Sequence, residues 1–431
     1  MNLIHRADCS SRGCVPARST KSEAIATIQK WSRGIALFAA AALLQGCGGS
    51  GGGGTAGTSG GIVLAGSNVQ PISVSAGLGG TVNLAFTSVI LCAPGSSNCQ
   101  SIDNVLIDTG SSGLRIMASA LSASLALPQQ TDTGGNPVVE CGHFVDGYTW
   151  GPVKLADLKM SGEQARSLPI QIIGDPNYPL VPAGCSASGA SKNSVASLRA
   201  NGILGLAIFP QDCGPACAQS SNPGLYYSCP PAGCQPATIP LALQLQHPVA
   251  KFAGDNNGVI IELPAVPAGG AASVSGSLVF GIGTQANNGI GSATVIGVDS
   301  ATSNFTTVYN GASYSASFID SGSNALFFAD AGTPVCTDPV AAGFYCPATT
   351  KNLSATIQGR NGRAALVNFS LANATALVTT NPGFAALGSL GAPQISANSF
   401  DWGLPFFYGR KVYIAIDGAN TPAGSGPYIA F

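Results

Sequence analysis

Two aspartates in similar local sequences are the residues of this chain whose types and positions most clearly allow chemistry. Val105–Ile116 has the sequence VLIDTGSSGLRI, and Ala316–Phe328 has the sequence ASFIDSGSNALFF. In each stretch an apolar run typical of a buried strand ends at an aspartate, Asp108 or Asp320, and a glycine turn follows. The pattern of a strand followed by Asp-(Thr/Ser)-Gly-Ser therefore occurs twice.

Two carboxylates on matching strand ends predict a pair of lobes, related by pseudo-twofold symmetry, that bring Asp108 and Asp320 face to face. Like charges that close cannot both ionise, so one carboxyl group holds a proton while the other is charged. Such a pair supplies a base and an acid at one pH, which the addition of water to an amide requires. One copy alone would be better explained as a loop aspartate that caps its own turn, but the second copy reverses that judgement.

The composition predicts a sheet-rich protein of two lobes, residues 62–255 and 256–431. The chain has 431 residues, of which 45% are hydrophobic, only 9% are charged and 57 are glycine. This balance is typical of a turn-rich, all-β protein. The net charge is -1, and residues 1–46 carry +4, so the remainder is acidic. We therefore expect no binding of nucleic acid.

The cysteines indicate an oxidising compartment. Of the thirteen, ten follow Cys47, which is an even number. Pairs such as Cys92 with Cys99 and Cys336 with Cys346 would close short loops.

Four further cysteines, Cys213, Cys217, Cys229 and Cys234, form a Cys-rich insert. Their spacing is compatible with zinc, but the intervening Pro, Ser and Gly and the absence of a nearby His favour disulfides. The connectivity of the cysteines stays open.

The amino-terminal segment, residues 1–47, is predicted to be a lipoprotein signal peptide. The apolar run Ile35–Leu44 is followed by Gln-Gly-Cys47, which resembles the cleavage site of bacterial lipoproteins, where the cysteine becomes the acylated first residue. An ordinary signal peptide or a membrane helix is the alternative, although the run is too short to span a bilayer. Residues 48–61 are rich in glycine and predict a flexible tether.

A lipid on Cys47 would attach a soluble body to a membrane of the bacterial cell envelope. The next residue is Gly48 instead of the Asp that retains such lipoproteins in the inner membrane of well-studied bacteria. We therefore expect the outer membrane, with the protein facing the periplasm.

The two Asp motifs resemble those of the pepsin-like aspartic peptidases, and the resemblance extends from about residue 70 to the end of the chain. Asn201–Leu206 (NGILGL) resembles the segment that buttresses the first catalytic loop of that family. Ser277–Gly283 resembles the start of the second lobe, and Asp401–Asp417 resembles the strand pair that closes it. The order of these segments is more specific than any one of them. It implies an all-β, bilobal fold with pseudo-twofold related lobes and a central cleft.

The resemblance also implies the chemistry. Asp108 and Asp320 would activate a water held between them, without a cofactor or a metal ion. Thr109 and Ser321 match the hydroxyl groups that lock the two loops together. Ser111 and Ser323 match those that hydrogen-bond the outer carboxylate oxygens. The residues expected to support the aspartates are Thr109, Gly110, Ser111, Ser321, Gly322 and Ser323.

Cys141–Val153, CGHFVDGYTWGPV, is predicted to form a β-hairpin, and its place resembles the flap that covers a bound peptide in that family. Phe144 stands where the family has a tyrosine, and Arg115 stands where it usually has a tryptophan. Because these two positions touch in the family, we expect a replaced contact, with Tyr148 or Trp150 as candidates. An ordinary hairpin with core aromatics is the alternative. The expected flap residues are Phe144, Gly147, Tyr148 and Trp150.

The function favoured by these patterns is that of an aspartic-type endopeptidase, a monomer that cleaves extended peptide or protein substrates. A catalytically silent binding protein of the cell envelope with the same fold is the main alternative, since Arg115 and Phe144 depart from the family. A structural envelope lipoprotein is a third possibility.

Overall fold

The structure, a computed structural model, describes residues 65–394 and 396–431. The signal peptide, Cys47 and the glycine tether lie outside the described residues, so the expectations for them remain predictions. Strands dominate, and the longest helix in the described part has seven residues, Ala374–Thr380. The protein is therefore all-β, as its composition predicted. In the part that the structure describes, no helix is long and apolar enough to cross a membrane.

The elements before residue 257 are mostly long strands. The strands are β1 (Val69–Val74), β2 (Ala85–Cys92), β3 (Cys99–Asp108), β4 (Ser112–Met117), β5 (Val138–Phe144), β6 (Gly147–Met160), β7 (Glu163–Ile173), β8 (Gly202–Leu206), β9 (Tyr226–Ser228) and β10 (Gln235–Pro236). The helices are η2 (Ala118–Ala120), α2 (Ala183–Ser186), α3 (Val195–Leu198), α4 (Pro215–Gln219), η3 (Leu241–Leu243) and η4 (Val249–Lys251).

The elements after residue 257 include more short strands. The strands are β11 (Gly258–Leu263), β12 (Val274–Phe280), β13 (Val295–Gly297), β14 (Phe305–Tyr309), β15 (Ala312–Ile319), β16 (Leu326–Phe327), β17 (Lys351–Gln358), β18 (Ala364–Leu371), β19 (Gly391–Ala392), β20 (Asp401–Trp402), β21 (Arg410–Ala415), β22 (Asn420–Thr421), β23 (Gly424–Ser425) and β24 (Tyr428–Ala430). The helices are α5 (Ala374–Thr380) and η5 (Leu404–Phe407).

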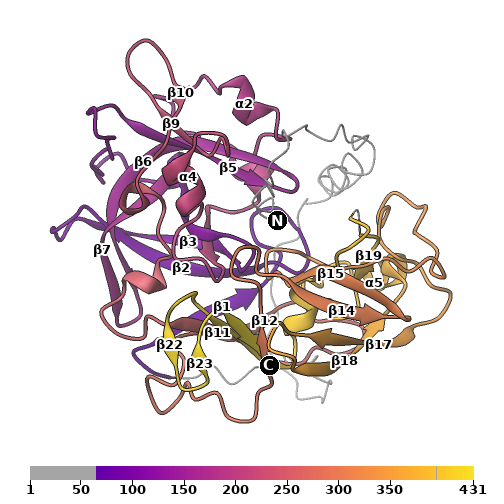
Figure 1. Ribbon diagram of the computed structural model, residues 1–431. Helices are drawn as coiled ribbons and strands as arrows, with labels where there is room; N and C mark the ends of the chain where they lie inside the picture. The colour runs from indigo at the N-terminus through magenta and orange to yellow at the C-terminus, as the bar shows by residue number, and fades with distance from the viewer. Residues whose placement is uncertain (1–64, 395) are drawn as a thin grey trace, which may run out of the picture.

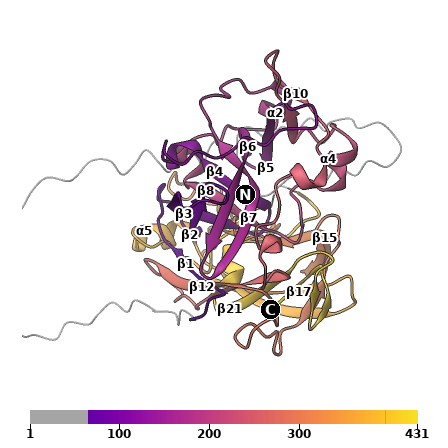
Figure 2. The same ribbon diagram turned by 90° about the vertical axis from the view of Figure 1, so that its left-hand side faces the viewer.

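A fifteen-stranded sheet includes strands from both halves of the chain, because β1 pairs with β12 along its whole length. Within it, β2 pairs with both β3 and β6, so the strands β6-β7-β4-β8-β3-β2 close on themselves. Figure 1 shows these strands at the upper left, β1, β11 and β12 below them, and β14 to β19 at the lower right. In Figure 2, β10 and α2 lie at the end of the molecule opposite β17 and β21.

Alternation along the strands explains the closed part of the sheet. In β3 the residues become continuously buried from Val105 to Asp108, where the strand enters the core. Side chains such as Val105, Ile107, Leu114 and Leu204 belong to the main hydrophobic core and are completely buried. Burial of such aliphatic side chains stabilises the fold by about 1.5–3 kcal/mol each.

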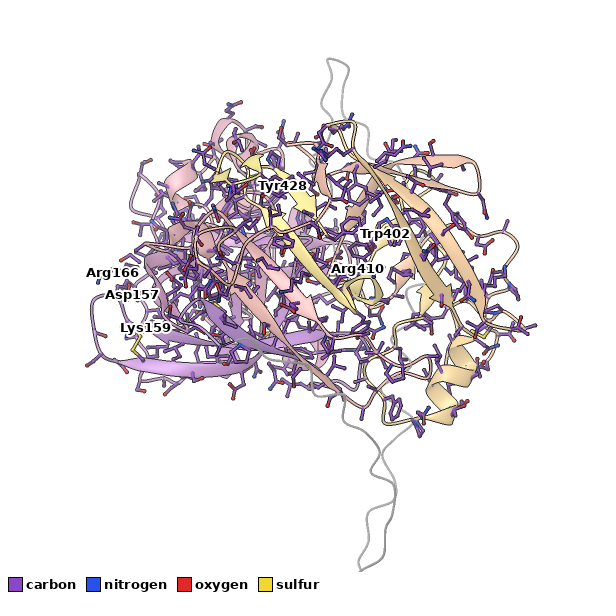
Figure 3. The ribbon with its side chains drawn as sticks, turned by 90° about the horizontal axis from the view of Figure 1, so that it is seen from below. Asp157, Lys159, Arg166, Trp402, Arg410 and Tyr428 are labelled. Atoms are coloured by element: carbon purple, nitrogen blue, oxygen red, sulfur yellow. A yellow bond between two sulfur atoms is a disulfide. The ribbon has the colours of Figure 1, made fainter. Side chains whose placement is uncertain are left out.

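The seven-stranded sheet, β18-β17-β14-β15-β20-β16-β19, carries an aromatic core. Phe400 stacks between Phe328, at 4.8 Å, and Trp402, at 4.2 Å. The indole of Trp402 also donates a hydrogen bond to Thr307. Figure 3 shows Trp402 and Arg410 in this half and Asp157, Lys159 and Arg166 at the other end of the molecule. The rings fix the short strands that surround Asp320.

The same four-strand arrangement occurs twice. In the first half, β3 is parallel to β8, β8 is antiparallel to β4, and β4 is parallel to β7. In the second half, β15, β20, β16 and β19 repeat these three pairings in the same order and with the same directions. The two Asp motifs are the turns from β3 to β4 and from β15 to β16. The sequence repeat is thus also a repeat of strand topology.

One expectation about the closing segment is wrong. Asp401–Asp417 does not form a pair of strands with each other, because β20 joins the seven-stranded sheet and β21 joins the fifteen-stranded one. The helix η5 separates them, and Pro405 in its first turn favours this break. The segment therefore connects the two sheets.

All ten cysteines after Cys47 form disulfides, which confirms the expected oxidised state. The predicted pairs Cys92–Cys99 and Cys336–Cys346 are present. The Cys-rich insert contains two disulfides, Cys213–Cys217 and Cys229–Cys234, and not a zinc site. The fifth bond, Cys141–Cys185, joins cysteines 44 residues apart and could not be assigned from the sequence.

Candidate active site

The two aspartates stand at equivalent strand ends. Asp108 is the last residue of β3, as the sequence predicted, and Asp320 directly follows β15. Three apolar residues precede Asp108, so the strand carries its carboxyl group into the core, where it is completely buried. Asp320 is equally buried, and its N–H donates to the carbonyl of Trp402 in β20. The strand pairing therefore sets the position of each carboxyl group.

Reciprocal hydrogen bonds lock the two motifs together. The N–H of Thr109 donates to the hydroxyl of Ser321 at 3.1 Å, and the N–H of Ser321 donates to the hydroxyl of Thr109 at 2.9 Å. The Ser321 hydroxyl also donates to the carbonyl of Ile107 at 2.8 Å. Because each loop supplies both donors and acceptors to the other, neither can shift without breaking buried bonds.

Each aspartate accepts the same two local hydrogen bonds. Asp108 Oδ1 accepts from the Gly110 N–H at 2.8 Å, and Oδ2 accepts from Ser111 Oγ at 2.5 Å. At Asp320 the corresponding distances are 2.8 Å and 2.7 Å, from Gly322 and Ser323. The outer oxygens are held by hydroxyl groups, as the resemblance implied.

The two carboxyl groups converge on Gly322. A Cβ added to this glycine would lie 2.8 Å from Asp108 Oδ1 and 3.1 Å from Asp320 Oδ1. Glycine is therefore required here by space and not by backbone conformation. Both inner oxygens lie within about 3 Å of one point, close enough for the two groups to interact strongly.

The environment makes one of the two groups a weak acid. Burial and the neighbouring charge of Asp320 raise the pKa of Asp108 from 3.8 to about 7. Near neutral pH the aspartate pair, Asp108 with Asp320, therefore has a protonated and a charged member available together. This is the condition for acid and base catalysis in a single site.

Two glycines behind the motifs allow the close approach of the neighbouring strands. A Cβ on Gly205 in β8 would lie 2.8 Å from the carbonyl oxygen of Ser111. A Cβ on Gly403 would lie 2.7 Å from that of Ser323. Asn201–Leu206 thus supports the first loop directly, through β8, and Gly403 does the same in the second half.

The predicted hairpin is present, formed by β5 and β6, with Phe144 paired to Gly147. Phe144 and Trp150 are completely or almost completely buried, and Tyr148 is 7% exposed. The guanidinium of Arg115 lies 5.7 Å from the centre of the Phe144 ring. The contact that replaces the expected Trp–Tyr pair is therefore between Arg115 and Phe144 themselves. Trp150 packs against Tyr227 instead.

Arg115 also holds the base of the hairpin through a buried ion pair. Its guanidinium lies 2.6 Å from Glu140 in β5 and 3.6 Å from Asp212 in the Cys-rich insert. Tyr226 donates a hydrogen bond to Asp212 at 2.7 Å. Burial, followed by the charge of Glu140, raises the pKa of Asp212 well above its usual value. The network links the first aspartate loop, the hairpin and the insert.

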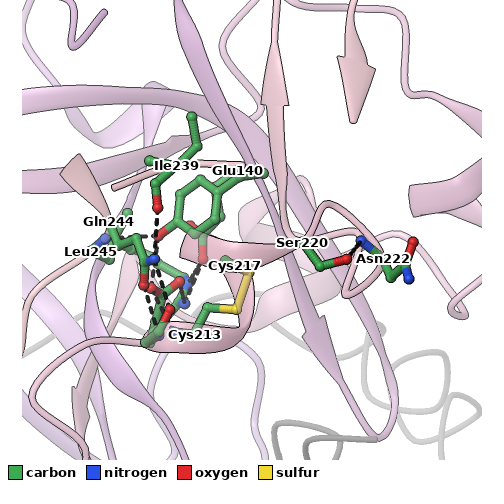
Figure 4. The surroundings of a disulfide bond; sticks show 12 residues. Glu140, Cys213, Cys217, Ser220, Asn222, Ile239, Gln244 and Leu245 are labelled. Carbon is green, nitrogen blue, oxygen red and sulfur yellow. Dashed lines mark hydrogen bonds and ion pairs between the residues drawn. A yellow bond between two sulfur atoms is a disulfide. The ribbon is translucent and has the colours of Figure 1, made fainter. Parts of the chain in front are cut away.

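Gln244 fixes the insert beside this network. Its side-chain amide accepts from the N–H of Gly214 and donates to the carbonyl oxygens of Gly214 and Ile239. Figure 4 shows these bonds next to the Cys213–Cys217 disulfide, with Glu140 behind them. The insert is therefore an ordered part of the hairpin's support.

Asn83 is a structural residue of the site that the sequence gave no reason to select. Its backbone is left-handed, with φ of 55°. Its side chain donates to the carbonyls of Asn324 and Leu387, and it accepts from the Leu387 N–H and the Tyr408 hydroxyl. Asn324 follows the second Asp motif, so Asn83 ties that motif to the first half of the chain.

Metal ligands are not gathered in this region. Within residues 65–394 and 396–431, no group of three or more His, Cys, Asp or Glu side chains is arranged to hold a metal ion. The two aspartates and their hydroxyl groups are the reactive groups that the fold brings together.

Comparison with known proteins places the chain in a family without indicating an activity. None of the curated proteins matches it. A family model with the description "Protein of unknown function (DUF3443)" matches residues 65–431. That range covers the part of the chain that the structure describes, so the protein is a member of the DUF3443 family.

Proposed function

We propose that this protein is an aspartic-type endopeptidase that hydrolyses peptide bonds with a water activated between Asp108 and Asp320. The observation that carries the proposal is the pair of cross-bonded Asp motifs, which hold two buried carboxyl groups against each other. Holding two carboxyl groups together costs free energy, because burial and proximity both disfavour ionisation. Such a cost is expected where the pair has a catalytic use.

The mechanism follows from the different states of the two groups. Asp320, charged, takes a proton from the water as its oxygen bonds to the peptide carbonyl carbon. Asp108, whose pKa of about 7 keeps it protonated, gives its proton to the carbonyl oxygen. Asp320 then gives its proton to the amide nitrogen, the C–N bond breaks, and Asp108 takes the proton back from the intermediate. Both groups return to their starting states.

The repeated strand topology around the two motifs supports a pepsin-like bilobal fold. In that arrangement residues 62–255 and 256–431 form the lobes, and the β5–β6 hairpin serves as the flap over an extended peptide. Gly147, Tyr148 and the exposed Val145 near its tip would then lie closest to the substrate. The substrate is a peptide or protein chain, bound by a monomer.

A catalytically silent binding protein is the second candidate, favoured by how firmly the hairpin is attached. The Cys141–Cys185 disulfide fixes one strand of it. Lys192 pairs with Asp146 at 2.6 Å, and the N–H of Tyr148 donates to the carbonyl of Ala190. A hairpin held in this way opens less readily than a free one, which favours binding over turnover.

Incubation of the purified protein with a mixed peptide pool tests the proposal. We expect cleavage products, detected by mass spectrometry, that disappear with a statine-type transition-state analogue. The Asp320→Asn variant serves as the matched control, because it has nearly the same shape. Binding of the analogue without any cleavage would favour the silent binding protein, and neither binding nor cleavage would refute both candidates.

The location of the protein is proposed from the sequence alone. Leu44-Gln45-Gly46-Cys47 supports a lipid anchor in the cell envelope, with the outer membrane facing the periplasm as the expected site. Changing Cys47 to Ser should release the protein from the membrane fraction or leave it unprocessed. Unchanged fractionation and mass would contradict the anchor.

A further inference from the structure

A third carboxyl group, that of Asp401, lies behind the second aspartate loop. Ser323 Oγ is 2.7 Å from Asp320 Oδ2 and also 2.7 Å from Asp401 Oδ2. Asp401 is 4% exposed and belongs to β20, which pairs with β15. The hydroxyl group thus stands between two buried carboxyl groups.

The number of protons limits the possible states of this chain of three groups. A serine hydroxyl has one proton and can donate to only one acceptor at a time. If both carboxyl groups were ionised, one of the 2.7 Å contacts would be between a lone pair and a negative oxygen. One of the two carboxyl groups must therefore carry a proton and donate to Ser323 Oγ.

The hydrogen-bond donors favour the proton on Asp401. Asp320 accepts the Gly322 N–H on its other oxygen, which stabilises a negative charge there. In the described part of the chain, Asp401 Oδ1 has no hydrogen-bond partner, so a charge on Asp401 would be poorly compensated. Burial and the adjacent charge of Asp320 raise the pKa of Asp401 well above its usual value.

The first half of the molecule lacks this arrangement. In the parallel pairing of β3 with β8, Leu106 faces Ile203, and in that of β15 with β20, Phe318 faces Asp401. Ile203 therefore occupies the position equivalent to Asp401, and its apolar side chain offers Ser111 no hydrogen bond. The repeat is asymmetric at the point where it touches the outer carboxylate oxygens.

We propose that Asp401 is a positioning residue that, held protonated, donates through Ser323 to Asp320 and so places the negative charge on Asp320 and the proton on Asp108. The catalytic consequence rests on the proposed peptidase function, but the assignment of protons does not. Charge asymmetry in the aspartate pair would then be built into the fold before any substrate binds.

The titratable groups that face Asp401 are Asp320 and, further away, Asp108. Among the described residues, no Lys, Arg or His forms an ion pair with Asp401. A cation that could hold Asp401 ionised is therefore not provided by these residues.

Two substitutions separate the proposed role from a merely structural one. Asn in Asp401→Asn can still donate to Ser323 Oγ, so it mimics the protonated acid. Leu in Asp401→Leu has a similar shape but no donor. Asp255→Asn, which changes a buried carboxyl group hydrogen-bonded to Gln285 and outside the aspartate pair, is the control.

The measurement is the titration of aspartate Cγ resonances by NMR in protein labelled with ¹³C at aspartate, which needs no activity. In the wild type we expect Asp401 to remain protonated at pH 6. Asp401→Asn should leave the lower apparent pKa of the aspartate pair unchanged, and Asp401→Leu should raise it by about one unit, the scale of one lost charge-assisted hydrogen bond. If the protein hydrolyses peptides, the acidic limb of its pH profile should shift in the same way.

Several results would overturn the proposal. An ionised Asp401 at pH 6 in the wild type would do so even if the leucine variant failed to fold. A lower apparent pKa of the pair in both Asp401 variants would show that Asp401 is charged and repels Asp320. No shift in a folded Asp401→Leu would show that Asp401 does not position the proton. The expected titrations in a protein that cleaves no peptide would refute the peptidase and leave the proton assignment standing.

Discussion

The two aspartate loops share their backbone bonds but differ in the pair of side chains behind them. In the first half, Arg115 on β4 faces Ile203 on β8. In the second half the equivalent strands place Phe327 opposite Asp401. The first pair has a buried cation and an apolar residue, and the second has an apolar residue and a buried acid. A repeat that is nearly exact in backbone hydrogen bonds is thus opposite in charge one layer behind.

The difference teaches which parts of the repeat are constrained by geometry. The Asp, Gly and Ser positions must satisfy the same local hydrogen bonds in both halves, so they are alike. The positions behind them meet different neighbours. Arg115 finds two carboxylates and the Phe144 ring, which together compensate its burial. Asp401 meets mainly other acids and is compensated only by a proton.

The largest expected effect is on the cooperation of the two halves in activity. Asp108→Asn and Asp320→Asn should each lower kcat by about 10³-fold or more, because each removes half of the acid–base machinery. The double variant should be hardly worse than either single one, since the pair acts as a unit. Single-turnover peptide cleavage measures this. Activity that survives Asp320→Asn would break the comparison at its centre.

Removal of the cation behind the first loop should destabilise the protein strongly. Arg115→Met leaves Glu140 and Asp212 buried without their partner, and we expect the free energy of unfolding to fall by about 3–5 kcal/mol. Urea denaturation measures this change. Arg166→Met, at an exposed position, is the control and should stay within about 0.5 kcal/mol of the wild type. A small effect of Arg115→Met would mean that the two carboxyl groups are neutral without it.

The pH dependence of stability tests the proton held by Asp108. Because its pKa is about 7 in the folded protein and 3.8 in the unfolded chain, the folded state binds an extra proton between these values. Its contribution to stability therefore falls as pH rises from 4 to 7, by up to about 1.4 kcal/mol per pH unit, and is constant above pH 7.

Asp108→Asn removes this term, so the variant should gain stability relative to the wild type as pH rises through the same window. Thermal melts from pH 4 to pH 8 give the difference in Tm. A difference that does not change with pH would place the proton elsewhere in the aspartate pair.

The smallest of these effects concerns the bond between the halves. Asn83→Ala leaves the carbonyls and N–H groups that Asn83 bonds in the second half without partners and should cost about 1–3 kcal/mol. Asn104→Ala is a matched control, because Asn104 has the same left-handed backbone, with φ of 56°. Equal losses for the two variants would show that backbone strain, and not the tie between the halves, explains the effect of Asn83.

The sequence by itself determined the features that depend on short stretches of chain. Apolar runs before Asp108 and Asp320 predicted the strands that carry them, because period and burial are visible in a few residues. Cys92 with Cys99 and Cys336 with Cys346 were predictable, since neighbouring cysteines close short loops. The two Asp-x-Gly-Ser motifs likewise contain their own hydrogen-bonding pattern.

Only the tertiary structure decided the contacts between distant parts of the chain. Asn83 bonds a residue 304 positions away, and Asp401 reaches Ser323 across 78 positions. Arg115 meets Glu140 and Phe144 because β4 and β5 are brought together by β7 and β6. No local pattern encodes such partners, because a buried charge is acceptable only where the fold supplies its compensation. The side chains behind each aspartate are therefore set by packing, and they decide how the pair shares its proton.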